Sequence, residues 1–359
     1  MTDRSLLCPT AFVDSPFGFD GQVARLAGGM NWFAAVELIR IDGSKRSASE
    51  LVAVADIDAH LSDDDMARQW AALTAPRAPL QLGSRTIRLD QPQIMGILNV
   101  TPDSFSDGGQ FADGSAAAEA GYAMASAGAA IIDVGGESTR PGATHVWEGD
   151  EIERIEPVIR QLAGGGTAVS VDTRKSEVMT AAVAAGAAMI NDVSALTFDE
   201  RSPAAAAAAA VPVVLMHHRG DPATMQDNPR YDDVLVEVFL WLEERIAAAV
   251  AAGIARERIL IDPGFGFGKA VSHNLELMNG LALFHALGCP IVLGASRKRT
   301  IGALSNEVTA SERLPGSLAL ALKAVGQGVQ IVRVHDVAET VQALRIWRGL
   351  KDQALTPRS

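Results

Sequence analysis

The chain has 359 residues, 48% of them hydrophobic, which suffices for one barrel-sized core with an additional segment. Its formal net charge of −12 argues against nucleic acid as a general partner, because such binding needs a basic surface. Two cysteines, together with the lack of a signal-like or membrane-spanning apolar run, predict a cytoplasmic protein without a membrane span.

Residues 1–79 differ in composition from the rest of the chain and contain proline, glycine and acidic clusters. Residues 32–41 predict a strand, and the capping-box spacing of Ser47 and Glu50 predicts a helix after it. Residues 80–89 predict a small hairpin. We therefore expect 1–79 to be an extension of unknown role that carries no recognisable chemistry.

From residue 80 to residue 352 one unit recurs, a short apolar strand followed by an amphipathic helix. Strands that are apolar throughout are typical of parallel sheets with both faces buried. Their recurrence predicts a (β/α)8 TIM barrel, an α/β fold, with a tail at 353–359. The predicted strands are 94–99, 130–134, 168–172, 188–192, 212–217, 259–262, 290–294 and 330–335. The predicted helices are 115–127, 150–163, 175–185, 201–209, 231–252, 273–287, 311–326 and 337–350.

Local signals agree with these boundaries. The capping-box spacing of Thr309 and Glu312 predicts the start of the seventh helix. The alanine run at 204–210 favours a packed helix over a flexible linker, because alanine is the best helix former. Glycines suited to left-handed helix ends come shortly before the strands at Gly128, Gly186, Gly253, Gly288 and Gly328.

In a barrel of this kind the active site lies at the carboxyl ends of the strands. One polar residue there could simply cap a loop, but nearly every predicted strand ends in one, which favours a functional site. These strand-end residues are Asn99, Asp133, Asp172, Asn191, Asp192, Met216, His217, Asp262, Ser296, Arg297, Lys298, Arg333 and His335.

Two long loops follow the first two strands, at 101–109 and 135–142. Both are polar, contain glycine and proline, and are long enough to close over a ligand. Ordinary surface turns are the alternative, although Phe105 and Arg140 are unusual at idle loop tips. A third segment, residues 262–269, alternates glycine with phenylalanine. Its spacing does not match a phosphate-binding loop, and it suits the approach of a flat ligand better.

Arg333 alternates with apolar residues inside the last predicted strand. A buried guanidinium requires an anion, a carboxylate or an aromatic face. His335 could contact the same anion or serve only as a hydrogen-bonding strand end, and Arg299 could equally be a solvated surface charge. His217 and His218 lack metal-ligand spacing, so we do not expect zinc.

Several of these segments resemble the dihydropteroate synthases. Residues 97–109 and 133–142 are similar to the two signature segments of that family. The further similar segments keep the family's order over about residues 85–350. They are 171–173, 190–193, 215–217, 262–269, 294–298 and 333–336.

The resemblance implies that the amine of p-aminobenzoate attacks 6-hydroxymethyl-7,8-dihydropterin diphosphate and releases pyrophosphate, forming dihydropteroate in folate biosynthesis. It also implies a homodimer and competition by sulfonamide analogues of p-aminobenzoate. Mg²⁺ would be bound by Asn99 with the diphosphate. The implied catalytic residues are Asn99, Asp133, Asp172, Arg140, Lys298, Arg333 and His335. The implied pterin contacts are Asp172, Asn191, Asp262 and Lys298, lined by Met216, Phe267 and Gly294. The implied diphosphate contacts are Arg140, Arg333 and His335, and those to p-aminobenzoate are Thr139, Pro141 and Ser296.

Three alternatives remain open at this level. A methyltetrahydrofolate–corrinoid methyltransferase of similar architecture would keep the pterin contacts but would not need the loop at 101–109 or the diphosphate groups. A non-catalytic pterin-binding protein would not need a Mg²⁺ position. A generic barrel aldolase or isomerase would need a lone lysine or glutamate base, which the predicted rim does not offer.

Overall fold

The computed structural model describes residues 4–101, 114–137, 146–220 and 228–356. Its centre is an eight-stranded parallel sheet in the order β12-β11-β10-β9-β8-β7-β14-β13, and a bridge between Ile261 and Ile291 joins the two edges. The sheet is therefore closed into a TIM barrel, which confirms the predicted fold. Its strands are β7 (Gln93–Asn99), β8 (Ile131–Gly135), β9 (Val169–Asp172), β10 (Met189–Asp192), β11 (Val213–Met216), β12 (Ile259–Asp262), β13 (Val292–Leu293) and β14 (Ile331–Val334).

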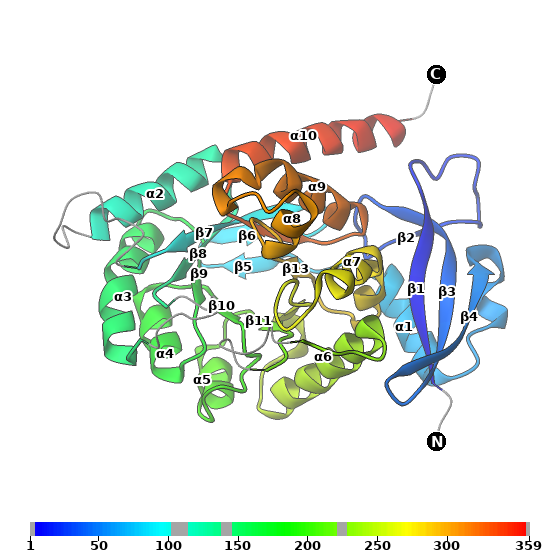
Figure 1. The fold of residues 1–359 in the computed structure, drawn as a ribbon, viewed down its shortest axis with the longest axis horizontal. Helices are drawn as coiled ribbons and strands as arrows, with labels where there is room; N and C mark the ends of the chain where they lie inside the picture. The colour runs from blue at the N-terminus through cyan, green and yellow to red at the C-terminus, as the bar shows by residue number, and fades with distance from the viewer. Residues whose placement is uncertain (1–3, 102–113, 138–145, 221–227, 357–359) are drawn as a thin grey trace.

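Helices cover the outside of the barrel (Figure 1). They are α2 (Gly114–Ala127), α3 (Glu148–Gly164), α4 (Ser176–Ala185), α5 (Ser202–Ala209), α6 (Val234–Ala251), α7 (Val271–Asn279), α8 (Arg299–Leu304), α9 (Leu314–Gly326) and α10 (Val337–Ala354). The described residues of this region also form the 3₁₀ turns η3 (Arg256–Arg258), η4 (Leu281–Leu287) and η5 (Ala310–Glu312). The alanine run forms α5, as predicted. The predicted helix 273–287 is wrong as a single element, because α7 ends at Asn279 and is followed by Gly280, where a Cβ would lie 2.4 Å from Leu235 Cδ1.

The short helix α8 was not predicted, and it lies directly after the predicted site residue Lys298. The capping box of Thr309 and Glu312 does form, with the Thr309 amide donating to Glu312 Oε2 at 3.1 Å. It caps η5 rather than the seventh predicted helix, which begins two residues later as α9. The glycine before β10 behaves as predicted, since Gly186 ends α4 with a φ of 115°.

The barrel has a seam between β12 and β13. Residues 290–294 were predicted to form a strand, but β13 contains only Val292 and Leu293. Pro290 has no N–H to give to a ladder, although its carbonyl accepts from Ile261 at 3.0 Å. The Ile291 amide turns to the Gln330 side chain at 2.8 Å. Few backbone hydrogen bonds therefore close the barrel at this point.

The lower interior of the barrel is filled by one apolar cluster. Inward residues of the strands, including Met95, Ile131 and Leu260, pack there against Leu82 and Ile87. The last two belong to the hairpin of β5 (Leu80–Leu82) and β6 (Arg85–Ile87), whose existence was predicted. The hairpin therefore plugs the end of the barrel opposite the carboxyl ends of the strands.

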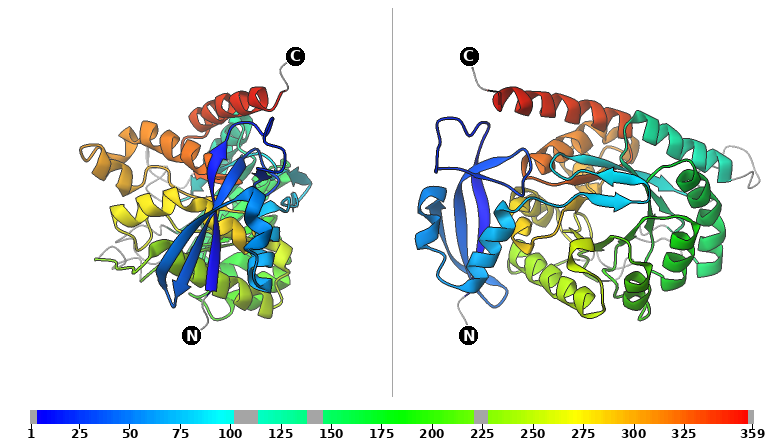
Figure 2. Two further views of the ribbon diagram at one scale, coloured as in Figure 1. Left: turned by 90° about the vertical axis from the view of Figure 1, so that its right-hand side faces the viewer. Right: turned by 180° about the vertical axis from the view of Figure 1, so that it is seen from behind.

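Residues 4–79 form a smaller antiparallel sheet with a helix at its side, which we call the N-terminal domain. It lies beside the barrel (Figure 2). Its strands pair in the order β1-β3-β2, and β4 also pairs with β3, along residues 35–42, beyond the short β2. The elements are β1 (Arg4–Val13), β2 (Ala24–Arg25), β3 (Trp32–Asp42), β4 (Lys45–Ala53), η1 (Val54–Ala59) and α1 (Asp64–Thr74).

The strand predicted at 32–41 is confirmed as β3. The helix predicted after Ser47 and Glu50 is wrong, because both residues lie in β4, paired with β3. Cross-strand hydrogen bonds and the burial of Val52 against the sheet outweigh a local capping-box spacing. The helix of this domain is α1, capped by Asp63, whose carboxylate accepts from the Met66 amide at 2.8 Å. None of the helices in the described ranges is long and apolar enough to span a membrane.

Candidate active site at the carboxyl end of the barrel

Four neighbouring strands bring predicted site residues into one row. Asn99 is in register with Gly135, Gly135 with Asp172, and Asp172 with Asn191. Met216 ends β11 in register with Asp262 at the end of β12. Because parallel strands present their carboxyl ends to the same rim, these side chains converge from separate parts of the sequence.

Arg333 joins two of the carboxylates. Its Nε lies 2.6 Å from Asp133 Oδ2, and its Nη2 lies 2.6 Å from Asp172 Oδ2. The Asn191 amide also donates to Asp133 Oδ2, at 2.9 Å. The expectation that a guanidinium inside the last strand must meet an anion or a carboxylate is confirmed by these contacts. We call Asp133, Asp172, Asn191 and Arg333 the rim cluster.

The rim cluster holds more acceptor capacity than it uses. Oδ1 of Asp133 and Oδ1 of Asp172 are buried, and neither has a hydrogen-bond partner among the described residues. Burial, with help from neighbouring carboxylates and against the effect of Arg333, raises the pKa of Asp172 to about 7. Unused buried acceptors are costly unless something donates to them. The cluster is therefore prepared for a ligand that presents N–H groups.

A second group of predicted residues lies across the seam. The Asp262 carboxylate accepts from the Gly264 amide at 2.7 Å, and burial raises its pKa. Gly294 lies beside it, because a Cβ there would sit 3.8 Å from Arg333 Cδ and 4.0 Å from Asp262 Oδ2. The Lys298 ammonium stands 3.8 Å above the centre of the Phe267 ring. An acid, an aromatic face and a cation thus meet at one side of the rim.

The loop at 262–269 is held in place by Lys269, for which no separate role was predicted. Its buried ammonium donates to the carbonyls of Gly264 at 2.9 Å and Phe267 at 3.2 Å, and it lies 2.8 Å from His217 Nδ1. Burial lowers the pKa of Lys269 to about 7. A Cβ on Gly264 would lie 1.7 Å from the His217 carbonyl oxygen. The glycine therefore permits backbone packing within the protein, and this close approach was not foreseen from the sequence.

The predicted residues after β13 and β14 include some that contact each other at the site and others with structural or surface roles. The Ser296 hydroxyl lies 3.1 Å from His335 Nδ1 and accepts from the His335 amide at 3.3 Å, so these two predicted residues meet. Arg297 instead forms a two-bond ion pair with Asp336 and serves the structure. Arg299 is exposed, in agreement with the alternative of a solvated charge.

Asp192 is also structural. Its Oδ1 accepts from the Ser194 amide at 2.7 Å and from the Ser194 hydroxyl at 2.6 Å, while its Oδ2 accepts from the Leu196 amide at 3.0 Å. Burial raises the pKa of Asp192 to about 6. Both oxygens are committed to the turn after β10, so this strand-end aspartate organises the loop.

A buried charge cluster at the base of the second loop was not predicted. The Lys175 ammonium donates to Glu151 Oε2 and to the Val146 carbonyl, both at 2.6 Å, and it lies 3.3 Å from Glu137 Oε2. Glu137 in turn accepts from the Val146 amide at 3.1 Å. A lysine three residues after a buried strand end was the available signal. The cluster joins the two ends of the segment 138–145.

Some predicted residues lie outside the described ranges. These are the residues from 102 to 109 in the first loop, and Thr139, Arg140 and Pro141 in the second. Among the residues that the structure does describe, no group of three or more histidine, cysteine or acidic side chains could hold a metal ion. Asn99 ends β7 half-buried and supplies one amide oxygen at the rim.

The barrel and its rim define an enzyme site for a ligand rich in N–H donors. The model of the pterin binding enzyme family matches residues 95–335. Dihydropteroate synthase from Escherichia coli is 50% identical over 262 residues, which cover 73% of this chain and 92% of the relative.

Two solved structures are similar as well. One is Xanthomonas albilineans dihydropteroate synthase with 4-aminobenzoic acid, at a TM-score of 0.73, 49% identity, and coverage of 78% of this chain and 100% of that one. The other is the Yersinia pestis dihydropteroate synthase with a sulfonamide drug, at 0.72 and 45%, covering 76% and 99%. The chain therefore belongs to the pterin binding enzyme family and, within it, to the dihydropteroate synthases.

Proposed function

We infer that the chain condenses 6-hydroxymethyl-7,8-dihydropterin diphosphate with p-aminobenzoate to give 7,8-dihydropteroate and pyrophosphate. Family membership gives the reaction, and the rim cluster gives the single structural observation that best supports it. Asp133 and Asp172 each keep one buried oxygen without a partner among the described residues. A pterin edge presents an amino group and ring N–H groups, which are the donors that such oxygens require.

The pterin would be held from both sides of the seam. Asp172 and Asn191 would take one part of the ring edge, and Asp262 would accept from the amino group and the adjacent ring N–H. Lys298 would donate to the ring carbonyl. This assignment is supported by the position of Lys298 over Phe267, 3.8 Å from the ring centre, close to Gly266 of the Asp262 loop. Met216 and Gly294 would line the faces of the ring.

The diphosphate would lie at the Asn99 end of the rim. Arg333 uses Nε and Nη2 for the carboxylates, so Nη1 can donate to a phosphate oxygen. Arg140 would add further positive charge, and His335 would add a hydrogen-bonding group. Asn99 offers a hard oxygen ligand, and Mg²⁺ is usually held by one or two protein oxygens together with substrate phosphates. When bound, Mg²⁺ would neutralise charge that develops on the departing diphosphate.

The residues of the chain would favour a dissociative substitution. Breaking the methylene C–O bond leaves positive charge on the methylene and ring, and carboxylates such as Asp172 would stabilise it. The neutral aromatic amine of p-aminobenzoate then bonds to the methylene carbon and afterwards loses a proton. Because this amine is nucleophilic when neutral, the site needs no strong base. Thr139, Pro141 and Ser296 would orient p-aminobenzoate.

The methyltransferase alternative fits the rim less well. Such an enzyme would retain the pterin contacts of Asp172 and Asn191. It would have no use for Ser296 and His335, which meet at the predicted anion end with 3.1 Å between the hydroxyl and Nδ1. A relative that is 50% identical over 92% of its length is a dihydropteroate synthase, in agreement with the main assignment.

Three further properties are part of the proposal. Sulfonamides should compete with p-aminobenzoate, since the similar Yersinia pestis enzyme was solved with a sulfonamide drug. The protein is expected to act as a homodimer in the cytoplasm. The two cysteines support a reducing compartment, because Cys8 and Cys289 are both buried and unbonded to each other.

A direct assay tests the proposed function. Enzyme, Mg²⁺, pterin diphosphate and p-aminobenzoate are mixed, and dihydropteroate and pyrophosphate are followed together. Equal amounts of both products are expected, and p-aminobenzoate omission should leave pyrophosphate near background. Folded protein that forms neither product would refute the function. Methyl transfer from methyltetrahydrofolate to a corrinoid protein would instead favour the alternative.

A further inference from the structure

The N-terminal domain is docked along α6, the helix that follows the loop after β11. Strand β1 lies against η4. Arg4 of the domain pairs with Glu243 of α6, and Arg46 pairs with Asp233, the cap of that helix. Lys45 adds an exposed pair with Asp232 beside the cap, at 3.4 Å. The Arg4 contact is at the middle of α6, and the Arg46 contact is at its beginning, near the rim. We therefore expect the two contacts to have different effects on the active site.

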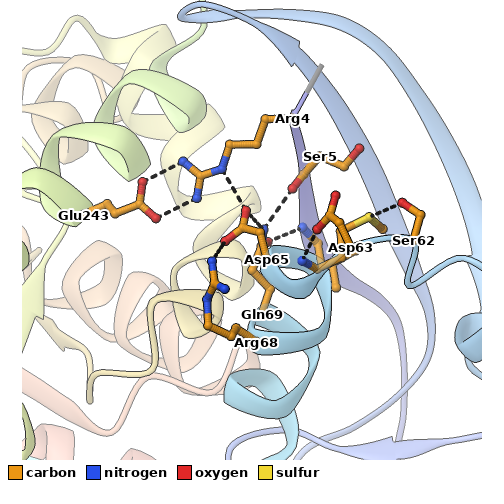
Figure 3. Close-up of polar contacts among 10 residues, drawn as sticks. Arg4, Ser5, Ser62, Asp63, Asp65, Arg68, Gln69 and Glu243 are labelled. Atoms are coloured by element: carbon orange, nitrogen blue, oxygen red, sulfur yellow. Dashed lines mark hydrogen bonds and ion pairs between the residues drawn. The ribbon is translucent and has the colours of Figure 1, made fainter. Parts of the chain in front are cut away.

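Arg4 contacts the middle of α6. Its Nη1 and Nη2 each lie 2.6 Å from a carboxylate oxygen of Glu243, and its Nε lies 2.9 Å from Asp65 of α1 (Figure 3). Asp65 also accepts from Gln69 at 3.1 Å, so the contact is part of a wider polar network. A two-bond arginine–carboxylate pair fixes orientation as well as distance. This contact attaches the domain to the barrel.

Arg46 contacts the beginning of α6, near the rim. Its Nε lies 3.1 Å from Asp233 Oδ2, and its Nη1 lies 2.5 Å from Glu37 of β3. Asp233 is the N-cap of α6, where its other oxygen accepts from the Val236 amide at 3.0 Å. The side chain of Asp233 is only 9% exposed. Arg46 therefore fixes the residue that starts the helix.

The cap of α6 is connected to the loop that carries Asp262 and Phe267. Two residues before Asp233, the Tyr231 hydroxyl donates to the Gly268 carbonyl at 2.9 Å. A Cβ on Gly268 would lie 2.4 Å from the carbonyl oxygen of Arg219, so the two loops fit closely. A displacement of residues 231–233 would thus be passed to the backbone beside Phe267.

We propose that Arg46 of the N-terminal domain is a positioning residue for pterin diphosphate binding, acting through Asp233 and Tyr231. The inference rests on the proposed function and assigns the domain a role in it. Arg4 does not contact Asp233 or Tyr231. Its partner Glu243 is ten residues further along α6 than Asp233, a distance of about 15 Å at 1.5 Å per residue. Arg4 therefore attaches the domain to the barrel, whereas Arg46 supports the site.

The test compares Arg46→Ala with Arg4→Ala in the full-length protein. Steady-state kinetics with each substrate varied in turn, and melting temperatures, are measured for both variants and for Arg40→Ala. Arg40 belongs to an exposed pair with Glu50, away from the barrel contacts, and serves as a control. Arg46→Ala should raise KM for pterin diphosphate about five- to tenfold, with KM for p-aminobenzoate and kcat changed less than about twofold. Arg46→Lys should restore part of the loss.

Tyr231→Phe provides an independent test, because it removes the hydrogen bond to Gly268 without touching the N-terminal domain. It should raise the same KM and leave the melting temperature nearly unchanged. Equal KM changes in the Arg4 and Arg46 variants, in proportion to their melting temperatures, would overturn the proposal. A normal KM in Tyr231→Phe would overturn it as well. Wild-type turnover in the same assay reports separately on the proposed function.

Discussion

Replacing Arg333 by methionine should show how much the ion pairs of the rim cluster contribute to the free energy of unfolding. The side chain keeps much of its apolar volume but loses the cation that bonds Asp133 and Asp172 at 2.6 Å each. Removing one partner of a buried ion pair typically lowers the free energy of unfolding by about 3–5 kcal/mol. Here the loss should depend on pH, because Asp172 can take up a proton when its cation is gone.

The size of the pH effect follows from the pKa of Asp172, which is raised from 3.8 to about 7. A carboxyl group with a raised folded-state pKa contributes stability below its unfolded pKa and loses it as the pH rises through the folded value. Between pH 6 and pH 8 the wild type should therefore lose about 1 kcal/mol through this group. In the variant the pKa of Asp172 should rise further, so the loss over the same range should be larger. The penalty of the substitution should thus grow by about 1 kcal/mol between pH 6 and pH 8.

Urea unfolding at pH 6, 7 and 8 measures this difference in wild type, Arg333→Met and Arg299→Met. The last variant changes an exposed arginine and should show little loss at any pH. A penalty for Arg333→Met that is the same at all three values would refute the reasoning. It would mean that the proton uptake assigned to Asp172 does not accompany loss of the cation.

Three further predictions concern other parts of the site. Asn99→Ala should raise the Mg²⁺ concentration for half-maximal turnover at least about tenfold, measured by metal titration of the chelator-treated enzyme, and an unchanged midpoint would remove Asn99 as a ligand. Lys175→Met leaves the buried Glu151 without its cation and should lower the free energy of unfolding by about 3–5 kcal/mol in urea; a loss below 1 kcal/mol, on the order of a surface pair, would contradict this. Gly264→Ala should melt well below Gly326→Ala, because its added Cβ would lie 1.7 Å from a carbonyl oxygen, whereas that of Gly326 meets nothing within 4 Å. Equal melting temperatures would contradict that packing.

The sequence was most informative where one physical requirement dominates. The barrel strands were predictable because burial on both faces demands continuous apolar runs, as in 259–262, which matches β12. Arg333 was predictable because a guanidinium in such a strand must find an anionic partner. Ser47 and Glu50 misled because long-range pairing with β3 decided their conformation, and no local spacing reports on that pairing.

The roles of strand-end residues were harder to separate from sequence. Asp172 and Asp192 both end apolar strands, yet only Asp172 keeps a buried oxygen without a partner among the described residues. The difference comes from Ser194 and the amide of Leu196, which satisfy Asp192 through turn geometry that forms only in the fold. Lys269 was missed for a related reason, since its partners are backbone carbonyls and carry no sequence signal.

The seam between β12 and β13 is the place where few backbone hydrogen bonds close the barrel, so we expect the sheet to open there first. With β13 only two residues long, amide hydrogens there should exchange with solvent sooner than those of the opposite strands. Asp262 ends β12 and Gly294 follows β13, so a ligand that contacts both residues would hold the two strands together. Ligand binding should therefore stabilise the closed barrel and slow amide exchange in β13.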